Sequence, residues 1–248
     1  MNNLLRKSLS NTSYLLAGSV ALFASACGHH DSSANGSSSD SGAGFFVDMF
    51  DDFEDGDRNV RNAGGRLGHW YNYDDQTVGM NNVLVGALDP TTERHTTYQT
   101  TSTMAMRVQA SGYTRWGSGY NADLLAGNPY NLSAYTGVVL WAKSMESHST
   151  TIHITIPDVS SDPRGGVCNK AADASTDQCY DAFGTDLDLS PEWQMYLLPF
   201  WALKQGGWGL SEPNGLDTTQ VYSFAVANLA GVTYDYWIDD IGFYRDTP

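Results

Sequence analysis

The sequence predicts an all-β fold, an antiparallel β-sandwich, for the part of the chain that begins at residue 45. Short segments in which apolar and polar residues alternate recur through this part, as expected for strands with one buried face. Clusters of Gly, Asn, Asp and Ser separate the segments, and helical periodicity is hard to find among them. About ten such segments in one domain are typical of two packed sheets.

The first 26 residues predict a secretion signal, with Arg6 and Lys7 at its basic start. The apolar run that follows is too short to cross a bilayer, which takes about 20 residues. Small residues lead directly into Cys27, an order that lipoprotein signal peptidase accepts. We expect Cys27 to be the lipidated first residue of a mature protein anchored at the outer membrane or cell surface. The alternative is an ordinary signal, cut near Ala26, that leaves a free thiol.

Residues 27–44 form the next region, and they predict a flexible linker. After the cysteine they read GHHDSSANGSSSDSGAG, with no large apolar side chain that could offset the entropy lost on folding. Roughly 200 residues follow, enough for one domain with its own core. The chain therefore divides into a signal peptide at 1–26, a linker at 27–44 and a folded domain at 45–248.

The charge of the chain excludes one class of partner. The sequence holds 28 acidic and 13 basic residues, for a net charge of -15. Nucleic-acid binding needs a basic surface, so nucleic acid is not expected as a partner. An acidic chain rich in Tyr and Trp is better suited to a neutral polar ligand, and we expect contact with a membrane only through the lipid anchor.

Six segments show the clearest alternation, and four weaker ones complete the predicted set. In 150–158, Ile152, Ile154 and Ile156 share one face, which leaves His153 on the other. The clearest segments are 103–111, 136–144, 150–158, 193–200, 221–229 and 234–244, and the weaker ones are 46–53, 82–88, 116–125 and 184–189.

Cys168 and Cys179 are the other two cysteines of the chain. In a secreted protein the default for such a pair is a disulfide, here closing the segment CNKAADASTDQC. A metal site is the less favoured alternative, because no histidine lies within the segment. We expect the bridge to hold a loop that has few apolar residues of its own.

Acidic residues stand at both ends of the predicted domain. In DDFEDGD, strand alternation would place Asp52 and Glu54 on one side, and the closing segment YWIDDIGFY embeds Asp239 and Asp240 among apolar residues. Carboxylates in such a strand are costly unless they are paired, protonated or bound to a metal. First and last strands often lie side by side in sandwiches, which would bring the two acidic groups together. Their hard oxygen ligands then favour a calcium ion. Solvated charge and a catalytic carboxylate pair, as in glycoside hydrolases, are the alternatives.

Four segments in order resemble a known family: DDFEDGD, YNLSAYTGVVLWAKS, LSPEWQMYLLPFWAL and YWIDDIGFY. Together they resemble family 11 carbohydrate-binding modules and their relatives, which are galactose-binding-like jelly rolls. The resemblance spans most of 46–245. It implies a structural calcium between the opening and closing strands, with Asp52, Glu54 and Asp239 as the carboxylates concerned.

The same resemblance implies a groove on one sheet that takes a β-glucan chain, with aromatic rings stacked on the sugar faces. The sequence departs from the β-glucan binders at Arg115 and Val226, where the family has tyrosines, and the segment between the two cysteines appears as an addition. These departures put the preference for mixed-linkage glucan in question. The ligand-binding residues that we expect are Tyr71, Tyr73, Arg115, Trp116, His153, Gln205, Trp208 and Ser223.

Together with the predicted lipid anchor, the resemblance implies a non-catalytic protein that binds a β-linked polysaccharide in an aromatic-lined groove braced by calcium. No catalytic residue is assigned. Two alternatives stay open: a glycoside hydrolase or lyase on the same sandwich, and an envelope protein-interaction or assembly module, since one fold serves many functions.

Overall fold

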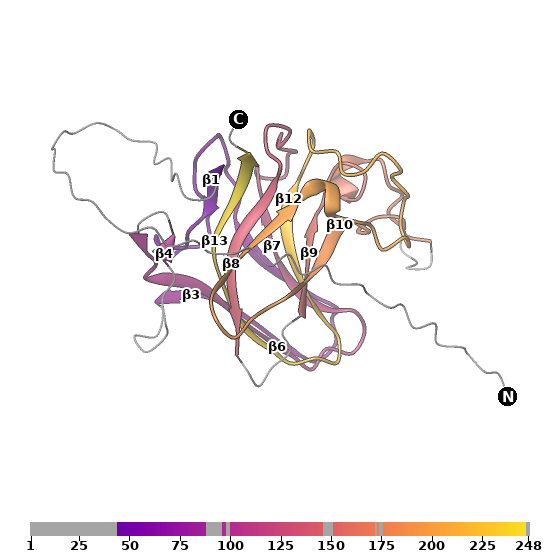
Figure 1. Ribbon diagram of the computed structural model, residues 1–248. Coiled ribbons are helices and arrows are strands. Elements are labelled where there is room, and N and C mark those ends of the chain that lie inside the picture. The colour runs from indigo at the N-terminus through magenta and orange to yellow at the C-terminus, as the bar shows by residue number, and fades with distance from the viewer. Residues whose placement is uncertain are drawn as a thin grey trace, which may run out of the picture. The chain divides into compact units, whose positions relative to one another are not determined.

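The computed structural model describes residues 44–87, 96–97, 100–145, 151–171, 173 and 176–246. The predicted signal peptide, Cys27 and the linker up to residue 43 lie outside the described residues. None of the helices in the described part is long and apolar enough to cross a membrane. Two short 3-10 helices, η1 (Pro163–Gly165) and η2 (Phe200–Ala202), lie in the connections between strands (Figure 1).

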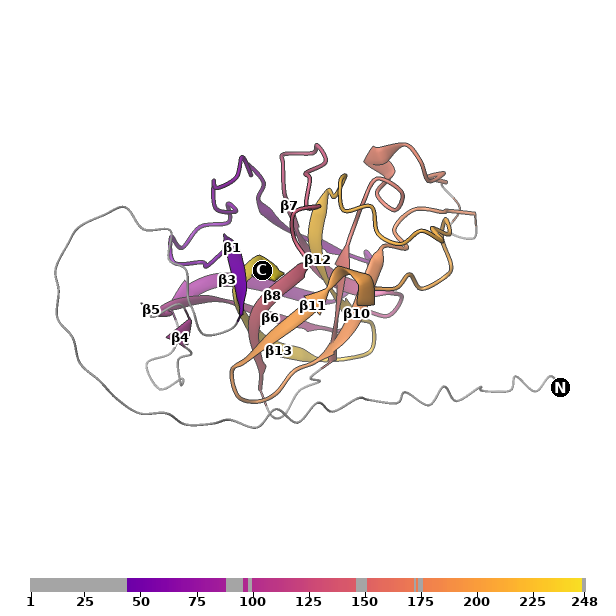
Figure 2. The same ribbon diagram turned by 45° about the horizontal axis from the view of Figure 1, so that its top comes forward.

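The strands form two antiparallel sheets, seen from two directions in Figures 1 and 2. The five-stranded sheet has the order β10-β9-β12-β7-β2, and the six-stranded sheet the order β11-β8-β13-β6-β3, with β1 also paired to β13. The five-stranded sheet consists of β10 (Phe183–Asp188), β9 (Thr151–Ile156), β12 (Ser223–Leu229), β7 (Gly117–Asp123) and β2 (Trp70–Asp74). The six-stranded sheet consists of β11 (Gln194–Pro199), β8 (Gly137–Ser144), β13 (Tyr234–Asp246), β6 (Met104–Ser111), β3 (Met80–Ala87) and β1 (Phe45–Asp51), and a separate ribbon pairs β4 (Thr96–Thr97) with β5 (Thr100–Thr101).

A single apolar core lies between the two sheets. Phe224 and Tyr120 enter it from the five-stranded sheet and Leu140 and Phe243 from the six-stranded sheet, all at most 1% exposed. The predicted antiparallel sandwich is confirmed, and each of the ten predicted segments contains a strand. Strand β2 was not among the predicted segments.

The first and last strands of the domain are neighbours, as expected. β1 pairs antiparallel with β13 along its whole length, with a bulge between Met49 and Asp51. The expectation that Asp52 and Glu54 project from one side of a strand is wrong. The strand ends at Asp51, whose carboxylate accepts the N–H of Phe53 at 2.9 Å, and Phe53 then adopts a φ of 54°. This local turn returns Phe53 to the core beside Phe50.

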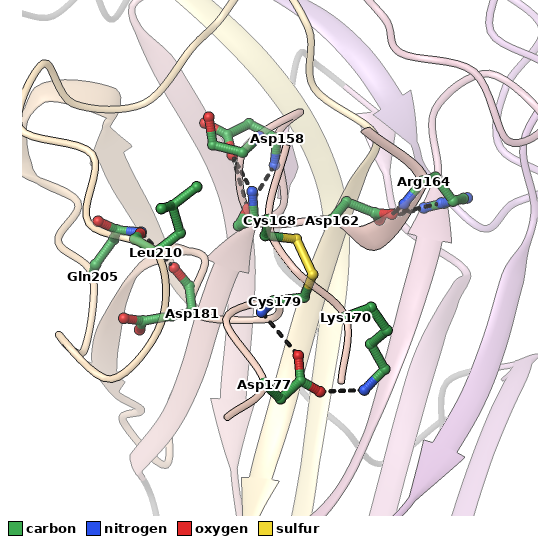
Figure 3. Close-up of a disulfide and its surroundings, with 12 residues drawn as sticks. Asp158, Asp162, Arg164, Cys168, Lys170, Asp177, Cys179, Asp181, Gln205 and Leu210 are labelled. Atoms are coloured by element: carbon green, nitrogen blue, oxygen red, sulfur yellow. Dashed lines mark hydrogen bonds and ion pairs between the residues drawn. A yellow bond between two sulfur atoms is a disulfide. The ribbon is translucent and has the colours of Figure 1, made fainter. Parts of the chain in front are cut away.

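The predicted disulfide between Cys168 and Cys179 is confirmed, and both cysteines are buried. Figure 3 shows Asp181 and Gln205 on one side of the bridge and Arg164 of η1 on the other. The bridge therefore fixes the segment that lies between helix η1 and the start of β10.

Candidate functional site

The outer face of the five-stranded sheet is the candidate site, and we call it the platform face. Its residues alternate with core residues such as Tyr120 and Phe224. The middle strands carry small side chains there, and the ring of Tyr73 lies over one of them, Gly119. One row across the sheet is Tyr73, Gly119, Ala227, His153 and Asp186, the next is Tyr71, Asn121, Ala225, Thr155 and Gly184, and Asp123 and Ser223 face each other beyond it.

Tyr73 lies against the sheet at Gly119. A Cβ on Gly119 would fall 2.4 Å from Cζ and Oη of Tyr73, so only glycine leaves room for the ring in this position. The phenol hydroxyl lies 3.4 Å from the carbonyl oxygen of Val226 on β12. The indole of Trp116, 54% exposed, continues the aromatic surface, with ring centroids 5.9 Å apart and planes 33° apart.

Tyr71 is tied to polar side chains of β7. Its hydroxyl accepts a hydrogen bond from the Asn121 amide and lies 3.4 Å from an oxygen of Asp123. Burial, followed by the charge of Asp123, raises the pKa of the Tyr71 hydroxyl, which stays neutral at physiological pH. Asp123 in turn pairs with Arg164 at 2.8 Å, and the same guanidinium pairs with Asp162 at 2.7 Å. This network holds η1 against the end of the platform face at which Asp123 lies.

Two buried polar atoms on the platform face have no hydrogen-bond partner within the described chain. They are Oδ1 of Asn121, in a residue 6% exposed, and Oγ of Ser223, in a residue 1% exposed. Buried polar groups are almost always hydrogen-bonded, to protein or to water. These two atoms are therefore available to a water molecule or to a ligand hydroxyl.

Asp75 and Asp181, both 3% exposed, each hold a loop that carries an exposed tryptophan. One carboxylate oxygen of Asp75 accepts the N–H groups of Arg115 and Gly117, on either side of Trp116, at 2.9 Å each. The backbone of Arg115 is thus fixed, while its side chain is exposed to solvent. The position of Trp116 next to Tyr73 follows from this turn.

Asp181 holds the second loop, at residues 205–210. Its carboxylate accepts four backbone N–H groups, those of residues 206 to 209, at 2.7 to 2.9 Å. A Cβ on Gly209 would fall 2.4 Å from the Asp181 side chain, and one on Gly206 would fall 2.9 Å from the Trp208 ring. Trp208 is 60% exposed in this rigid turn.

The predicted ligand-binding residues fall into two groups. Tyr71, Tyr73, His153 and Ser223 lie on the platform face, with Trp116 and Arg115 at its β2 end. Gln205 and Trp208 lie in the loop beyond β10, which is tied to the sheet by two 2.9 Å backbone hydrogen bonds between Gly184 and Lys204.

Two of these residues have polar partners of their own. The Gln205 amide donates to the carbonyl oxygens of Asp181 and Leu210, and its oxygen accepts the Glu212 N–H, so this side chain braces the loop. His153 Nδ1 lies 2.8 Å from a carboxylate oxygen of Asp186.

Sequence reasoning missed Asn121, Asp123 and Arg164. Alternation within 116–125 would have placed the first two opposite the core, since Tyr120 and Ala122 point inward. No local signal announces Arg164, because its partner Asp123 lies far away in the sequence.

A separate acidic cluster joins the two ends of the domain. Ser102 Oγ lies 3.3 Å from Oε1 of Glu54 and 2.5 Å from Oδ2 of Asp239. Glu54 also accepts the N–H groups of Thr103 and Met104 at 2.7 and 2.9 Å. Asp239 is completely buried, and burial, with the nearby charges of Glu54 and Asp52, raises its pKa to about 8.

The donor chemistry of this cluster fits calcium. The Glu54 and Asp239 carboxylates, the Ser102 hydroxyl and the Met104 carbonyl, which accepts from that hydroxyl at 2.8 Å, are all hard oxygen groups. Asp52, the third expected carboxylate, pairs with Arg61 at 2.6 Å. Three or more His, Cys, Asp or Glu side chains do not gather into a metal cluster anywhere in the described ranges. A calcium ion would here need backbone, hydroxyl and water oxygens to complete its shell.

Comparisons with known proteins establish the fold. No protein-family model matches the chain, and no curated protein sequence matches it. The solution structure of CtCBM11 is 16% identical, with 84% of this chain and 99% of that chain covered and a TM-score of 0.52.

Two further solved structures are more distant. The family 11 carbohydrate-binding module from Clostridium thermocellum, in complex with a β-1,3-1,4-mixed-linked tetrasaccharide, is 16% identical over 79% of this chain and 94% of that chain, with a TM-score of 0.48. TmCBM61 in complex with β-1,4-galactotriose is 11% identical over 79% of this chain and 94% of that one, with a TM-score of 0.39. The likeness to CtCBM11 shows a shared fold, the jelly-roll sandwich of that carbohydrate-binding module.

Proposed function

We propose that this protein is a non-catalytic carbohydrate-binding module that takes a β-linked polysaccharide across its platform face. One observation carries the proposal. The middle of the platform face carries small residues such as Ala227, and Tyr71 and Tyr73 border it on β2. The same face contains the buried hydroxyl oxygen of Ser223, which has no hydrogen-bond partner in the described part of the chain. A sugar binds to a surface that offers both aromatic rings for stacking and polar atoms for hydrogen bonds to its hydroxyl groups.

The chemistry of a pyranose matches this arrangement. Its C–H face is apolar and packs on an aromatic ring such as that of Tyr73 or Trp116, as rings do with other apolar surfaces. Its edge carries hydroxyl groups, which both donate and accept, so they can satisfy the Asn121 oxygen and the Ser223 hydroxyl. Both requirements are met on neighbouring strands, with Tyr73 on β2, Asn121 on β7 and Ser223 on β12.

The shared fold supports the same function, since CtCBM11 is the subject of binding studies and has the same sandwich. The identity of the sugar rests on the residues of this chain alone. Arg115 stands where the family's β-glucan binders have a tyrosine, whereas Val226, the other departure, is buried in the core and does not reach the platform face. We therefore propose the broader class of β-linked polysaccharides.

Two further parts of the proposal lie away from the platform face. Calcium bound by Glu54 and Asp239 would neutralise the buried carboxylate of Asp239 and hold β1 to β13, with a structural effect only. The secretion signal and the lipidation of Cys27 would attach the domain to the outer membrane or cell surface through the linker. Labelling of the expressed protein with a fatty acid, and its loss in Cys27→Ser, would test the anchor.

Calorimetric titration tests the sugar binding. Soluble β-glucan, xylan, mannan and galactan oligosaccharides are titrated into the protein, its Tyr73→Ala variant and a Val78→Ala control, whose side chain is 94% exposed and not aromatic. We expect at least one sugar to bind, the Tyr73→Ala change to weaken it at least about tenfold, and the control to be unchanged. Absence of binding across the whole series would refute the proposal.

A further inference from the structure

We infer that the protein carries a second saccharide site, in a cavity at the edge of the sandwich. The cavity has a volume of about 590 Å³ and lies between the segment 200–205 after β11 and the segment 212–218 before β12. This volume is within the range of about 300–1,000 Å³ that is usual for small-molecule sites. Its inner wall includes Phe183 and Phe200, which belong to the core between the sheets.

The position separates this cavity from the platform face. Phe183 and Phe200 point into the sandwich, whereas the platform face is the opposite, outer side of the five-stranded sheet. The cavity therefore opens where β10 and β11 form neighbouring edges of the two sheets. A ligand here would not occupy the row of Tyr73 and Gly119, so the inference goes beyond the proposed function.

Trp201 supplies the stacking surface of the second site. It lies in helix η2, lines the cavity, and is 78% exposed, more than Trp116 or Trp208. Its neighbour Phe200 is 8% exposed and fills the core, so the helix turns one aromatic ring inward and the next outward. An indole held outward beside a cavity has an apolar face that a sugar ring can cover.

Three polar side chains share the cavity with Trp201: Lys204, Glu212 and Asn214. None of the three has a side-chain hydrogen bond or ion pair with another residue in the described part of the chain. They offer an ammonium donor, a carboxylate acceptor and an amide that does both. The hydroxyl groups of one sugar can form hydrogen bonds with all three side chains at once.

This combination selects the class of ligand. The carboxylate of Glu212 opposes a simple anion that Lys204 alone would attract, and three polar groups disfavour a purely apolar guest. A neutral saccharide satisfies the set, with one ring on Trp201 and hydroxyls on the polar groups. The loop at 212–218 bounds the cavity on one side, and its volume of about 590 Å³ suits a short saccharide or a chain end.

Nuclear magnetic resonance of the tryptophan indole N–H groups tests the inference on the full chain. Cellotetraose, a mixed-linkage β-1,3-1,4 tetrasaccharide, β-1,4-galactotriose, xylotetraose and mannotetraose are titrated in turn, with the Trp201 signal assigned by its loss in Trp201→Phe. We expect one of them to shift the Trp201 signal in the Tyr73→Ala variant, where the platform face is impaired. Trp201→Ala should weaken this second binding event at least about tenfold and leave platform binding within about twofold of its original affinity.

The outcomes are distinct. A shift at Trp201 without any at Trp116 supports the second site and refutes sugar binding at the platform face. Shifts at Trp116 with an unchanged Trp201 signal at saturation refute the second site and leave the platform face in place. If no signal moves with any sugar, both are refuted. Glu212→Gln, which keeps shape and hydrogen-bonding capacity, should retain the Trp201 shift if folding is intact, whereas Glu212→Ala should weaken it.

Discussion

The carboxylates of Glu54 and Asp239, at opposite ends of the domain, meet at the hydroxyl of Ser102, 3.3 and 2.5 Å away. Glu54 follows the first strand and Asp239 lies in the last, at a bulge in its pairing with β8. The contact therefore joins the two ends of the fold next to the pairing of β1 with β13. It also places two acidic groups close together, one of them completely buried.

Calcium should stabilise this junction. We expect millimolar calcium to raise the melting temperature of the protein relative to the same protein in chelator, because the ion binds the folded state and not the unfolded chain. Asp239→Asn should lose this increase. The exposed Asp57→Asn in the same acidic segment is the matched control and should keep it. An equal calcium effect in both variants would place the ion elsewhere.

Stability should fall with rising pH when calcium is absent. Burial raises the pKa of Asp239 to about 8 and that of Asp51 to about 7, both above the value of 3.8 for an ordinary aspartate. Between the unfolded and folded values the folded state binds more protons, so its stability is greatest at low pH and declines toward pH 8. Chemical denaturation from pH 4.5 to 8.5 in chelator measures the trend. A free energy of unfolding that rises over this range would contradict these assignments.

Asp181 should control the position of Trp208. Asp181→Ala removes the acceptor of four partly buried backbone N–H groups, and each lost hydrogen bond costs about 1 kcal/mol. We expect a destabilisation of about 2 to 4 kcal/mol and increased fast motion of the Trp208 indole, measured by nuclear magnetic relaxation. Asp186→Ala, in an exposed pair with His153, should leave the indole unchanged. An equally rigid Trp208 in Asp181→Ala would show that the ring is held by other contacts.

The disulfide should stabilise the fold. Replacing Cys168 and Cys179 by serine frees a loop of about a dozen residues, and a closed loop of that size contributes about 3 kcal/mol. We expect the double serine variant to unfold at lower denaturant concentration, with most of its sheet signal in circular dichroism retained beforehand. A midpoint unchanged from that of the parent would mean that the loop is held by its hydrogen bonds alone.

Strands were predictable wherever one face was apolar and the other polar. Strand β2, WYNYD, has no such contrast, because Trp70 is buried while Tyr71 and Tyr73 are aromatic on the opposite face. The end of β1 was missed for a different reason: the Asp51 carboxylate captures the Phe53 N–H, and this turn overrides the alternation.

Parts of the site could be found from the sequence, and others depend on long-range contacts. Strand register brought Ser223 to the face on which Tyr71 and Tyr73 lie, as its alternation indicated. The pairing of Arg164 with Asp123 joins helix η1 to the end of β7, a long-range contact that no local pattern encodes. Trp201 gave no signal, because LPFWAL reads as one apolar run although Phe200 is buried and the next residue is exposed.

A crystal structure of the domain with the tightest-binding oligosaccharide tests the central claim most directly. The account predicts a sugar ring stacked on Tyr73 or Trp116, with a hydroxyl within hydrogen-bonding distance of Asn121 Oδ1 or Ser223 Oγ. Density for the sugar only on other surfaces, with these two atoms bonded to nothing but water, would contradict it.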